Sequence, residues 1–485
     1  MTAGCAGDDG RESTTAGDSA ASDDDAVVSF GPVETTGEGD GDGDGDGDGD
    51  GDGDGDGIDH CGVLEGVVPV YAEQVARWVG QDELAPPPAD GLVFTGSSSI
   101  RRWEQVARIY AGDLPIQRGI GGAELGEIAL SIEELALRHH PRGLVVFAGT
   151  NDLAHGVPAP VVFERLRCLM QRARASDPAL PVFFIGVTPT PARWDSWPIA
   201  AEFNALASAL ADRDPALHYV DVATPFLATG QPPDSGLFAD DQLHLSPEGY
   251  ELWDQQLRPV IRAALPDTVA TPGAGLSEGA VVRVDLGPSN PEDGEFTPSP
   301  DWQGGHWNNW HPVDGDIEIV PGEHKDELVD SAGRPTALTL LIGGSFLANG
   351  RANGGLLWPE EELLGPFATG TATGDFFYAD DDDKPGALTL RGLSPAQSYT
   401  LRLFAAREEP EARVTRYTIY GDGAPSVGSL QTSGAGAGAT ATPTNDDTVL
   451  VMSGLVPDVY GQLHIDMSRE SGSYAYLSAF ELAAE

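Results

Sequence analysis

Three consecutive serines, Ser97, Ser98 and Ser99, follow the apolar run GLVFTG at 91–96. A serine hydroxyl at the end of a buried strand can act as the nucleophile of a hydrolase when a general base lies beside it. Taken alone, a serine-rich turn between a strand and a helix is more often a simple helix cap. The G-x-S-x-G elbow of α/β-hydrolases is excluded, because Ile100 stands where its second glycine would be. A nucleophile here requires another hydrolase layout.

A candidate general base occurs much later in the chain. The segment FADDQLHLSPEGY places Asp241 three residues before His244. Ser246 and Pro247 suit the N-cap and first position of a helix, so we expect a helix to begin soon after the histidine. A histidine held at such a loop end can accept a proton if a carboxylate or a backbone carbonyl orients its ring. A DxxH pair by itself is a weak signal, so its meaning depends on its neighbours in the fold.

Two further segments offer hydrogen-bond donors. RGIGGAEL contains Gly119, Gly121 and Gly122, and AGTNDL contains Asn151 and Asp152. Taken singly, the glycines indicate a tight turn, and the Asn-Asp pair indicates an Asx turn or a cap. A glycine amide and an asparagine amide beside a serine would instead bind the oxyanion of a tetrahedral intermediate.

All these segments follow predicted strands. The near-continuous apolar runs lie at 91–96, 114–119, 143–149, 181–187 and 217–222, and the amphipathic stretches lie near 103–111, 123–139, 159–176, 198–213 and 247–264. Their alternation predicts an α/β fold, with right-handed crossovers and an open parallel sheet covered by helices on both faces. Ligands of such sheets bind beyond the carboxyl ends of the strands. We therefore expect the serines, the glycines, the Asn-Asp pair and the histidine at one edge.

Taken in order, the segments GSSS, GIGG, GTND and DQLHLSPEGY resemble the four sequence blocks of the SGNH hydrolases, also called GDSL esterases, over roughly residues 90–262. The resemblance implies a flavodoxin-like, three-layer domain with a five-stranded parallel sheet and neither a cofactor nor a metal. The residues that it assigns to catalysis are Ser98 as nucleophile, the amide of Ser98 with Gly122 and Asn151 as oxyanion hole, His244 as base and Asp241 as its partner.

The segment TPTPARW at 188–194 is similar to one in the SGNH subgroup whose first block reads GSSSIR. Two residues depart from the family pattern. Ser97 replaces the usual Asp, which is familiar in that subgroup, and Gln117 replaces the Asn that commonly opens the second block. The second departure leaves Gly121 as the alternative to Gly122.

The hydrophobic period changes to two after residues 266–279, whose Pro, Gly and Ser content predicts a linker. The SGNH domain is accordingly assigned to 60–265. Strand-like runs separated by Gly, Pro, Asn and Asp turns fill 280–485 and predict an all-β, antiparallel sandwich. Its DLGPSN, HWNNWH and SYAYLSAFEL segments resemble the β-sandwich module found beside some SGNH hydrolases, which is similar to galactose-binding and carbohydrate-binding domains. This resemblance implies that the C-terminal part binds glycans.

The HWNNWH run leaves two questions open. Trp307 and Trp310 are equally compatible with stacking on sugar rings and with packing in a core. The spacing of His306 and His311 fits neither a helix face nor a usual zinc pattern, so structural roles are favoured.

Residues 1–58 are rich in Gly, Asp, Ser and Thr and end in a GD repeat, so we expect a disordered acidic tether. An EF-hand loop needs a bidentate Glu at its twelfth position, where this repeat has only Gly or Asp. A solvated linker is therefore favoured over calcium binding. The run from Asp380 to Asp383 is likewise interpreted as a solvated loop, with a calcium site as the alternative.

Three cysteines, Cys5, Cys61 and Cys168, predict neither a disulfide framework nor a zinc site. Cys168 lies in a helical pattern and is expected to be a half-buried thiol. TAGC at Cys5 resembles a bacterial lipoprotein box, but a lipid anchor there requires a signal upstream of Met1. A chance TAGC is the equal alternative. We expect an extracytoplasmic protein, either a cell-surface lipoprotein or a secreted one.

The formal net charge is −50, from 77 acidic residues against 27 Lys and Arg. Nucleic acid and anionic membranes need a basic surface, so both are excluded as expected partners. No apolar run is long enough to span a bilayer. The sequence predicts a serine esterase for small-molecule or polysaccharide esters, with acetyl esters of carbohydrate as the first substrate class. The alternatives are a lysophospholipase or thioesterase, and a non-catalytic surface protein that binds glycans.

Overall fold

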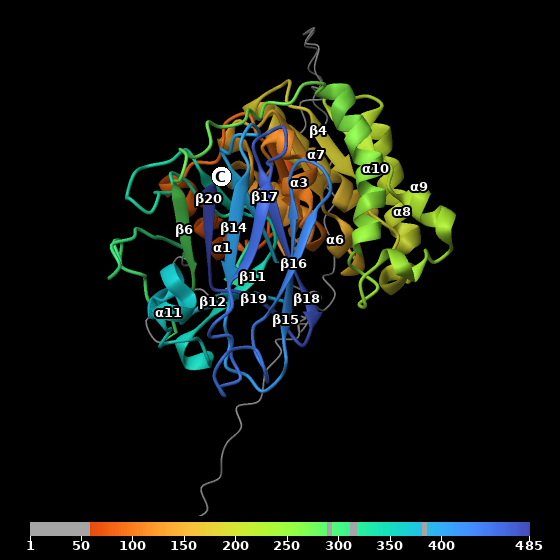
Figure 1. The fold of residues 1–485 in the computed structure, drawn as a ribbon. Helices are drawn as coiled ribbons and strands as arrows, with labels where there is room; N and C mark the ends of the chain where they lie inside the picture. The colour runs from red at the N-terminus through yellow and green to blue at the C-terminus, as the bar shows by residue number, and fades with distance from the viewer. Residues whose placement is uncertain (1–58, 289–292, 311–317, 381–385) are drawn as a thin grey trace, which may run out of the picture. The chain divides into compact units, whose positions relative to one another are not determined.

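A five-stranded parallel sheet organises the first part of the chain (Figure 1). Its strands are β1 (Leu92–Gly96), β2 (Ile116–Gly119), β3 (Gly143–Phe147), β4 (Val182–Ile185) and β5 (Leu217–Val220). Their order is β2-β1-β3-β4-β5, and every adjacent pair is parallel. The predicted α/β fold with five parallel strands is confirmed.

The computed structural model describes residues 59–288, 293–310, 318–380 and 386–485, which all belong to one compact unit. The predicted tether at 1–58, with Cys5, lies outside the described residues. So do His311 and the run from Asp381 to Asp383. In the described ranges, no helix is both long and apolar enough to cross a membrane.

Helices cover both faces of the sheet, because successive strand residues point to opposite sides. Val93 packs into one hydrophobic cluster, whereas Leu92 and Phe94 pack into another. The first cluster includes side chains of α1 (Ala72–Leu84), α4 (Leu125–Leu130), α5 (Ile132–Leu135), α6 (Thr150–Ala154), α7 (Ala159–Ser176) and α8 (Trp197–Ala211). The second includes side chains of α2 (Ser98–Arg101), α3 (Val106–Ile109), α9 (Ala223–Thr229) and α10 (Pro247–Ala264).

The C-terminal part is built mainly of strands in three sheets. The six-stranded sheet has the order β16-β15-β18-β13-β10-β9, the four-stranded sheet β19-β12-β11-β8 and the five-stranded sheet β17-β14-β20-β6-β7. The strands are β6 (Val281–Leu286), β7 (Asn308–Trp310), β8 (Glu318–Ile319), β9 (His324–Lys325), β10 (Thr339–Ile342), β11 (Phe346–Asn349), β12 (Phe376–Ala379), β13 (Gly386–Arg391), β14 (Tyr399–Phe404), β15 (Val414–Tyr420), β16 (Ser426–Gln431), β17 (Leu450–Leu455), β18 (Leu463–Ser471), β19 (Ala475–Leu477) and β20 (Ala479–Ala484). One hydrophobic core takes side chains from all three sheets. The β6–β7 pair is parallel, a departure from the expected antiparallel pattern.

The two tryptophans of HWNNWH are core residues. Trp307 is 3% exposed and Trp310 is 6% exposed. Trp307 packs edge-on against Phe367, and its indole Nε1 donates a hydrogen bond to Asp301 at 2.7 Å. Of the two open interpretations, core packing is therefore the one that the structure supports at both positions.

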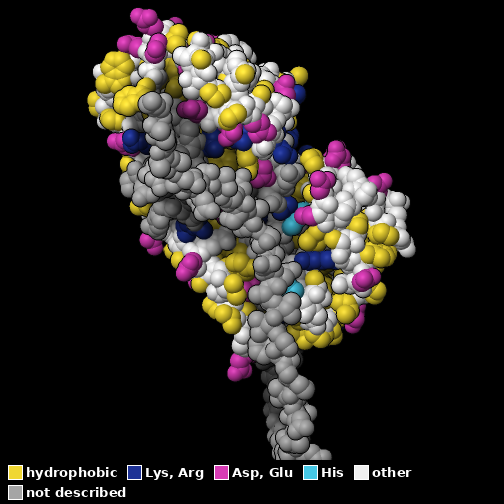
Figure 2. All heavy atoms as spheres, turned by 90° about the horizontal axis from the view of Figure 1, so that it is seen from below, with side chains coloured by type: hydrophobic (Ala, Val, Ile, Leu, Met, Phe, Trp, Pro, Cys, Tyr) yellow, Lys and Arg dark blue, Asp and Glu magenta, His cyan; other side chains and the backbone are white. Residues whose placement is uncertain are grey.

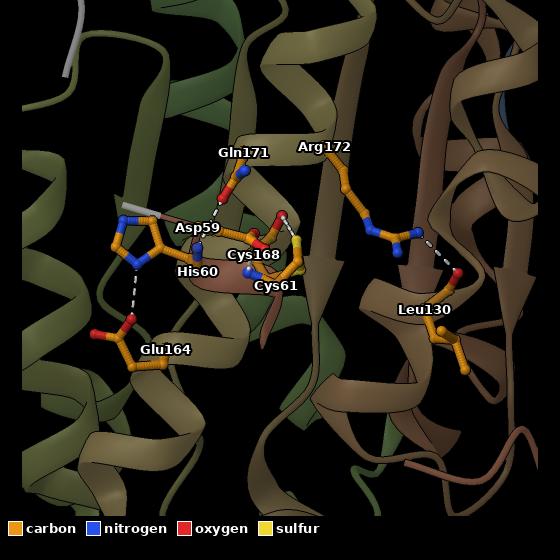
Figure 3. The surroundings of a disulfide bond; sticks show 8 residues. All are labelled: Asp59, His60, Cys61, Leu130, Glu164, Cys168, Gln171 and Arg172. Carbon is orange, nitrogen blue, oxygen red and sulfur yellow. Dashed lines mark hydrogen bonds and ion pairs between the residues drawn. A yellow bond between two sulfur atoms is a disulfide. The ribbon is translucent and has the colours of Figure 1, made fainter. Parts of the chain in front are cut away.

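A disulfide joins Cys61 to Cys168, 107 residues later (Figure 3). The expectation of a half-buried thiol at Cys168 is therefore wrong. The bond ties the short 3₁₀ segment His60–Leu64 to helix α7, where the backbone N–H of His60 also donates to Gln171 at 3.0 Å. The long separation explains the error, since two cysteines 107 residues apart leave no spacing pattern that marks them as partners.

On the face drawn in Figure 2, acidic side chains are spread over the described surface. Basic side chains occur there singly or in small groups. That face therefore presents no extended basic surface among the residues described.

Candidate active site

Ser98 is placed by the close approach of two strand ends. Gly96, the last residue of β1, has φ +139°, and a Cβ there would lie 2.0 Å from the carbonyl oxygen of Phe147 at the end of β3. The backbone N–H of Ser97 donates to that same oxygen at 2.9 Å. Helix α2 then begins at Ser98. The serine hydroxyl consequently lies at the carboxyl edge of the sheet, as the sequence predicts.

His244 connects Ser98 to Asp241. Its Nε2 lies 2.8 Å from the Oγ of Ser98, and its Nδ1 lies 2.5 Å from Oδ2 of Asp241. The other carboxylate oxygen of Asp241 accepts the backbone N–H groups of Leu243 and His244, each at 2.9 Å. This arrangement lets Nδ1 carry the hydrogen while Nε2 accepts the serine proton.

The same contacts keep Asp241 ionised. Partial burial by itself would raise the pKa of its carboxyl, but the hydrogen bonds from the His244 ring and from two backbone N–H groups hold that pKa well below the usual range. A charged carboxylate at this position can stabilise an imidazolium on His244.

Helix α10 fixes the base relative to the serine. Its N-cap, Ser246, accepts the backbone N–H of Gly249 at 3.3 Å, and Pro247 occupies the first position, as predicted. One turn into the helix, the hydroxyl of Tyr250 donates to the carbonyl of Ser99 at 2.8 Å. The helix that follows His244 is thereby joined to the serine turn through one buried tyrosine.

Asn151 and Asp152 hold the loop that follows β2. Nδ2 of Asn151 donates to the carbonyl of Ala123 at 2.9 Å, and Asp152 accepts the backbone N–H of Leu125 at 2.9 Å. Nη1 of Arg165 also donates a hydrogen bond to the Asp152 carboxylate at 2.6 Å. Burial raises the pKa of Asp152, although these hydrogen bonds oppose the shift. The sequence did not reveal this bracing role, since a GTND segment equally suits an Asx turn.

Gly122 lies in the loop between β2 and α4, at the same sheet edge. Its φ is +77°, and a Cβ there would lie 2.8 Å from the hydroxyl of Tyr71. Both the backbone conformation and this neighbour favour glycine. Gly122 is not one of the described residues that line the cavity at Ser98. Its amide therefore stays a predicted oxyanion donor.

A small cavity of about 20 Å³ brings Ser98, His244 and Asn151 together. Its lining residues are Ser98, Ser99, Phe147, Thr150, Asn151, Thr188, Thr190, Arg193, Leu243, His244, Leu245 and Trp253. Phe147 and Trp253 are almost fully buried, and the Trp253 indole is held by a 2.9 Å hydrogen bond to the hydroxyl of Thr188. These fixed side chains limit the space beside the serine.

Two residues of the site have roles that the sequence did not show. Gln117, the departure in the second block, is buried in β2 and donates to the carbonyls of Ile100 at 2.5 Å and Trp103 at 3.1 Å. It thus braces the turn after α2. Arg193 reaches the cavity from TPTPARW, and only the resemblance of that segment pointed to it. In the described ranges, no group of three or more His, Cys, Asp or Glu could hold a metal ion.

Comparison with known families decides what kind of domain carries this site. A sequence model of the GDSL-like lipase/acylhydrolase family matches residues 89–252. Residues 89–252 are a GDSL-like lipase/acylhydrolase domain. The matched range contains every residue that we expect to take part in catalysis, and the acylhydrolase domain makes the protein an ester hydrolase of the SGNH type.

Several solved structures are similar to part of this chain. A GDSL-like lipase from Bacteroides thetaiotaomicron is 20% identical, with 42% of this chain and 100% of that chain covered and a TM-score of 0.35. A member of the lipolytic G-D-S-L family from Veillonella parvula is 19% identical, with 35% and 97% covered and a TM-score of 0.31. A carbohydrate esterase family 3 protein from Talaromyces cellulolyticus is 18% identical, with 37% and 100% covered and a TM-score of 0.31. The search of curated proteins gave no match.

Proposed function

We propose that the acylhydrolase domain is a serine esterase that releases acetyl groups from carbohydrate, with Ser98 as nucleophile, His244 as base and Asp241 as its partner. The observation that carries the proposal is the position of His244, whose two ring nitrogens lie 2.8 Å from the Ser98 hydroxyl and 2.5 Å from the Asp241 carboxylate. A nucleophile, a base and an orienting carboxylate in that order are what acyl transfer to serine requires.

The reaction proceeds in two halves. Ser98 Oγ attacks the ester carbonyl while its proton passes to Nε2 of His244, and the oxyanion is stabilised by Asn151 with the amides of Ser98 and Gly122. The tetrahedral intermediate collapses, and the leaving alcohol takes the proton from His244. Water then attacks the acyl-enzyme, again losing a proton to His244. The second collapse releases the carboxylic acid and restores the serine hydroxyl.

The size of the cavity supports a short acyl group. About 20 Å³ beside Ser98 compares with roughly 10–15 Å³ for one water-sized site. An acetyl methyl group suits this space, which Phe147 and Trp253 border on its buried side. This favours acetyl esters over the lysophospholipase and thioesterase alternatives.

The proposal that the alcohol is a carbohydrate rests on the resemblance of the C-terminal part to carbohydrate-binding modules. Trp302 is 64% exposed and Trp358 is 88% exposed in that part. Exposed indole rings offer flat apolar faces on which sugar rings stack. We propose these two residues, in place of the buried Trp307 and Trp310, as the glycan contacts.

The disulfide between Cys61 and Cys168 supports an extracytoplasmic location, because disulfides persist mainly in oxidising compartments. We propose such a location for the protein. Cys5 lies outside the described residues. A lipid anchor at Cys5 is one way in which the protein could be held at the cell surface, and the proposed location does not depend on it.

A series of esters that differ only in acyl length tests the acyl preference. We expect kcat/KM for p-nitrophenyl acetate to exceed that for the butyrate and the octanoate. Acetylated xylo-oligosaccharides should release acetate, and lysophosphatidylcholine should not be hydrolysed. Ser98→Ala, measured in parallel, controls for contaminating esterases. A preference for octanoate or lysolipid would replace the acetyl proposal with the lipolytic alternative. No turnover or active-site labelling of well-folded protein would favour the non-catalytic glycan-binding alternative.

A further inference from the structure

We propose that Arg193 is a positioning residue that fixes the side-chain amide of Asn151 for oxyanion binding. This inference rests on the proposed esterase function. Nη1 of Arg193 donates to Oδ1 of Asn151 at 2.8 Å and to the hydroxyl of Thr150 at 3.1 Å. Arg193 and Asn151 both line the cavity at Ser98.

The two hydrogen bonds of Asn151 allow only one orientation of its amide. A guanidinium group donates and cannot accept, so it must face the amide oxygen. The carbonyl of Ala123 accepts and cannot donate, so it must face Nδ2, at 2.9 Å. A flipped amide would lose both interactions. Nδ2 carries two hydrogens, and the bond to Ala123 occupies one, which leaves the other to donate to an oxyanion on Ser98.

The backbone around Arg193 is anchored to the loop of the base. Arg193 lies in the 3₁₀ segment Pro191–Ser196, and its N–H donates to the hydroxyl of Thr190 at 3.3 Å. The N–H of Ala192 donates to the carbonyl of Gln242 at 3.1 Å, two residues before His244. One short segment therefore links the loop that carries the base to the helix that carries Asn151.

The positive charge of Arg193 also makes the side-chain N–H of Asn151 a stronger hydrogen-bond donor. A cation on Oδ1 polarises the amide, and hydrogen bonds in such a chain strengthen one another. The remaining N–H of Asn151 then binds a developing negative charge better than it binds the neutral ground-state carbonyl. Loss of Arg193 should consequently lower kcat and change KM little, since the interaction strengthens only as the oxyanion forms.

A double-mutant cycle on the full chain, with p-nitrophenyl acetate as substrate, tests this role. Arg193→Met should lower kcat roughly 10- to 100-fold, and Arg193→Lys should recover part of the loss because lysine keeps one charged donor. In an Asn151→Ala background, adding Arg193→Met should lower kcat by less than about threefold, since the two residues act as a unit. Arg213→Met, at an exposed position, is the matched control and should keep wild-type kcat.

Contrary results are distinguishable. Additive losses from Arg193→Met and Asn151→Ala, or a raised KM at unchanged kcat, would overturn the positioning role and make Arg193 a direct substrate contact. An Asn151→Ala variant with wild-type kcat would overturn it as well. Full activity of Ser98→Ala would instead contradict the proposed function itself. Thermal melting is followed for each protein, and Arg193→Gln takes the place of Arg193→Met if the latter does not fold.

Discussion

The Nε2 atom of His244 lies 2.8 Å from the Oγ atom of Ser98, although the two residues are 146 positions apart in the chain. Ser98 follows the first strand of the sheet and His244 precedes its last helix, so the contact exists only when the whole α/β domain has folded. The base is further tied to the serine loop through Tyr250 and the carbonyl of Ser99. The proposed proton transfer between Ser98 and His244 would thus depend on the packing of α10 in the hydrophobic cluster that contains Leu92 and Phe94.

Asp241→Asn should lower kcat by roughly 10²–10⁴-fold with little change in fold, because a neutral amide no longer stabilises the histidine cation. The pKa of Asp241 is held below its ordinary value in the folded state. Ionised Asp241 therefore contributes fully to the free energy of unfolding above the pKa of an unfolded Asp, about 4. This contribution is lost as the pH falls through the lower pKa of the folded state. A carbon-13 NMR titration should find the carboxylate still ionised at pH 4. A protonated Asp241 at that pH would contradict the orienting role.

Asn151→Ala removes one oxyanion donor, so kcat should fall roughly 10²–10³-fold while the fold is kept. His244→Ala should cost more, since it removes the base. Steady-state kinetics under conditions in which chemistry limits the rate give the comparison. If Asn151→Ala loses less than about threefold, Asn151 is better interpreted as a residue that only braces the loop through Ala123.

Reduction should destabilise the protein without changing its chemistry. The Cys61–Cys168 bond closes a loop of 107 residues, for which chain entropy predicts a contribution of about 4–5 kcal/mol. Dithiothreitol should lower the melting temperature of the wild type and leave that of Cys61→Ser unchanged. If dithiothreitol lowered both melting temperatures equally, loss of the disulfide would not be the cause of the destabilisation.

Glu323 should make stability depend on pH. Burial raises its pKa to about 7, against the opposing effect of a hydrogen bond from the backbone N–H of Val320. The folded state therefore holds a proton that the unfolded state has released between about pH 4.5 and 7, so the free energy of unfolding falls as the pH rises through that window. Glu323→Gln should flatten this dependence, whereas Glu251→Gln, at an exposed position, should not. Identical profiles for wild type and Glu323→Gln would exclude Glu323 as the origin.

The parallel sheet could be predicted closely because buried strands and amphipathic helices have different periods. The helices predicted at 159–176 and 247–264 have those bounds in the structure. The stretch at 123–139 is instead divided into α4, α5 and a 3₁₀ turn, because the backbone leaves the helical region near Ser131 and Ala136. The two- and three-residue strands β7, β8 and β9 are too short to show a period of two.

The site could be predicted in part. The sequence indicated that serine, asparagine and histidine would meet, because the carboxyl ends of parallel strands share an edge. It could not show that Arg193 faces the oxygen of Asn151, or that Cys61 pairs with Cys168, since both depend on contacts between distant elements. The predicted linker at 266–279 forms backbone hydrogen bonds on both sides. The N–H groups of Val269 and Ala270 donate to the carbonyl of Gly112 in the α/β part, whereas the N–H of Gly273 donates to the carbonyl of Leu393 in the β-rich part. The assignment of 60–265 to a separate domain stays a prediction.

The central claim is that Ser98 forms the acyl-enzyme, and peptide mapping after reaction with a fluorophosphonate probe tests it most directly. The account predicts that the probe modifies Ser98 in the wild type. Ser97→Ala and Ser99→Ala should keep at least part of both labelling and esterase activity, whereas Ser98→Ala should lose both while it keeps its fold. Modification of Ser97 in place of Ser98, or a fully active Ser98→Ala protein, would contradict the account.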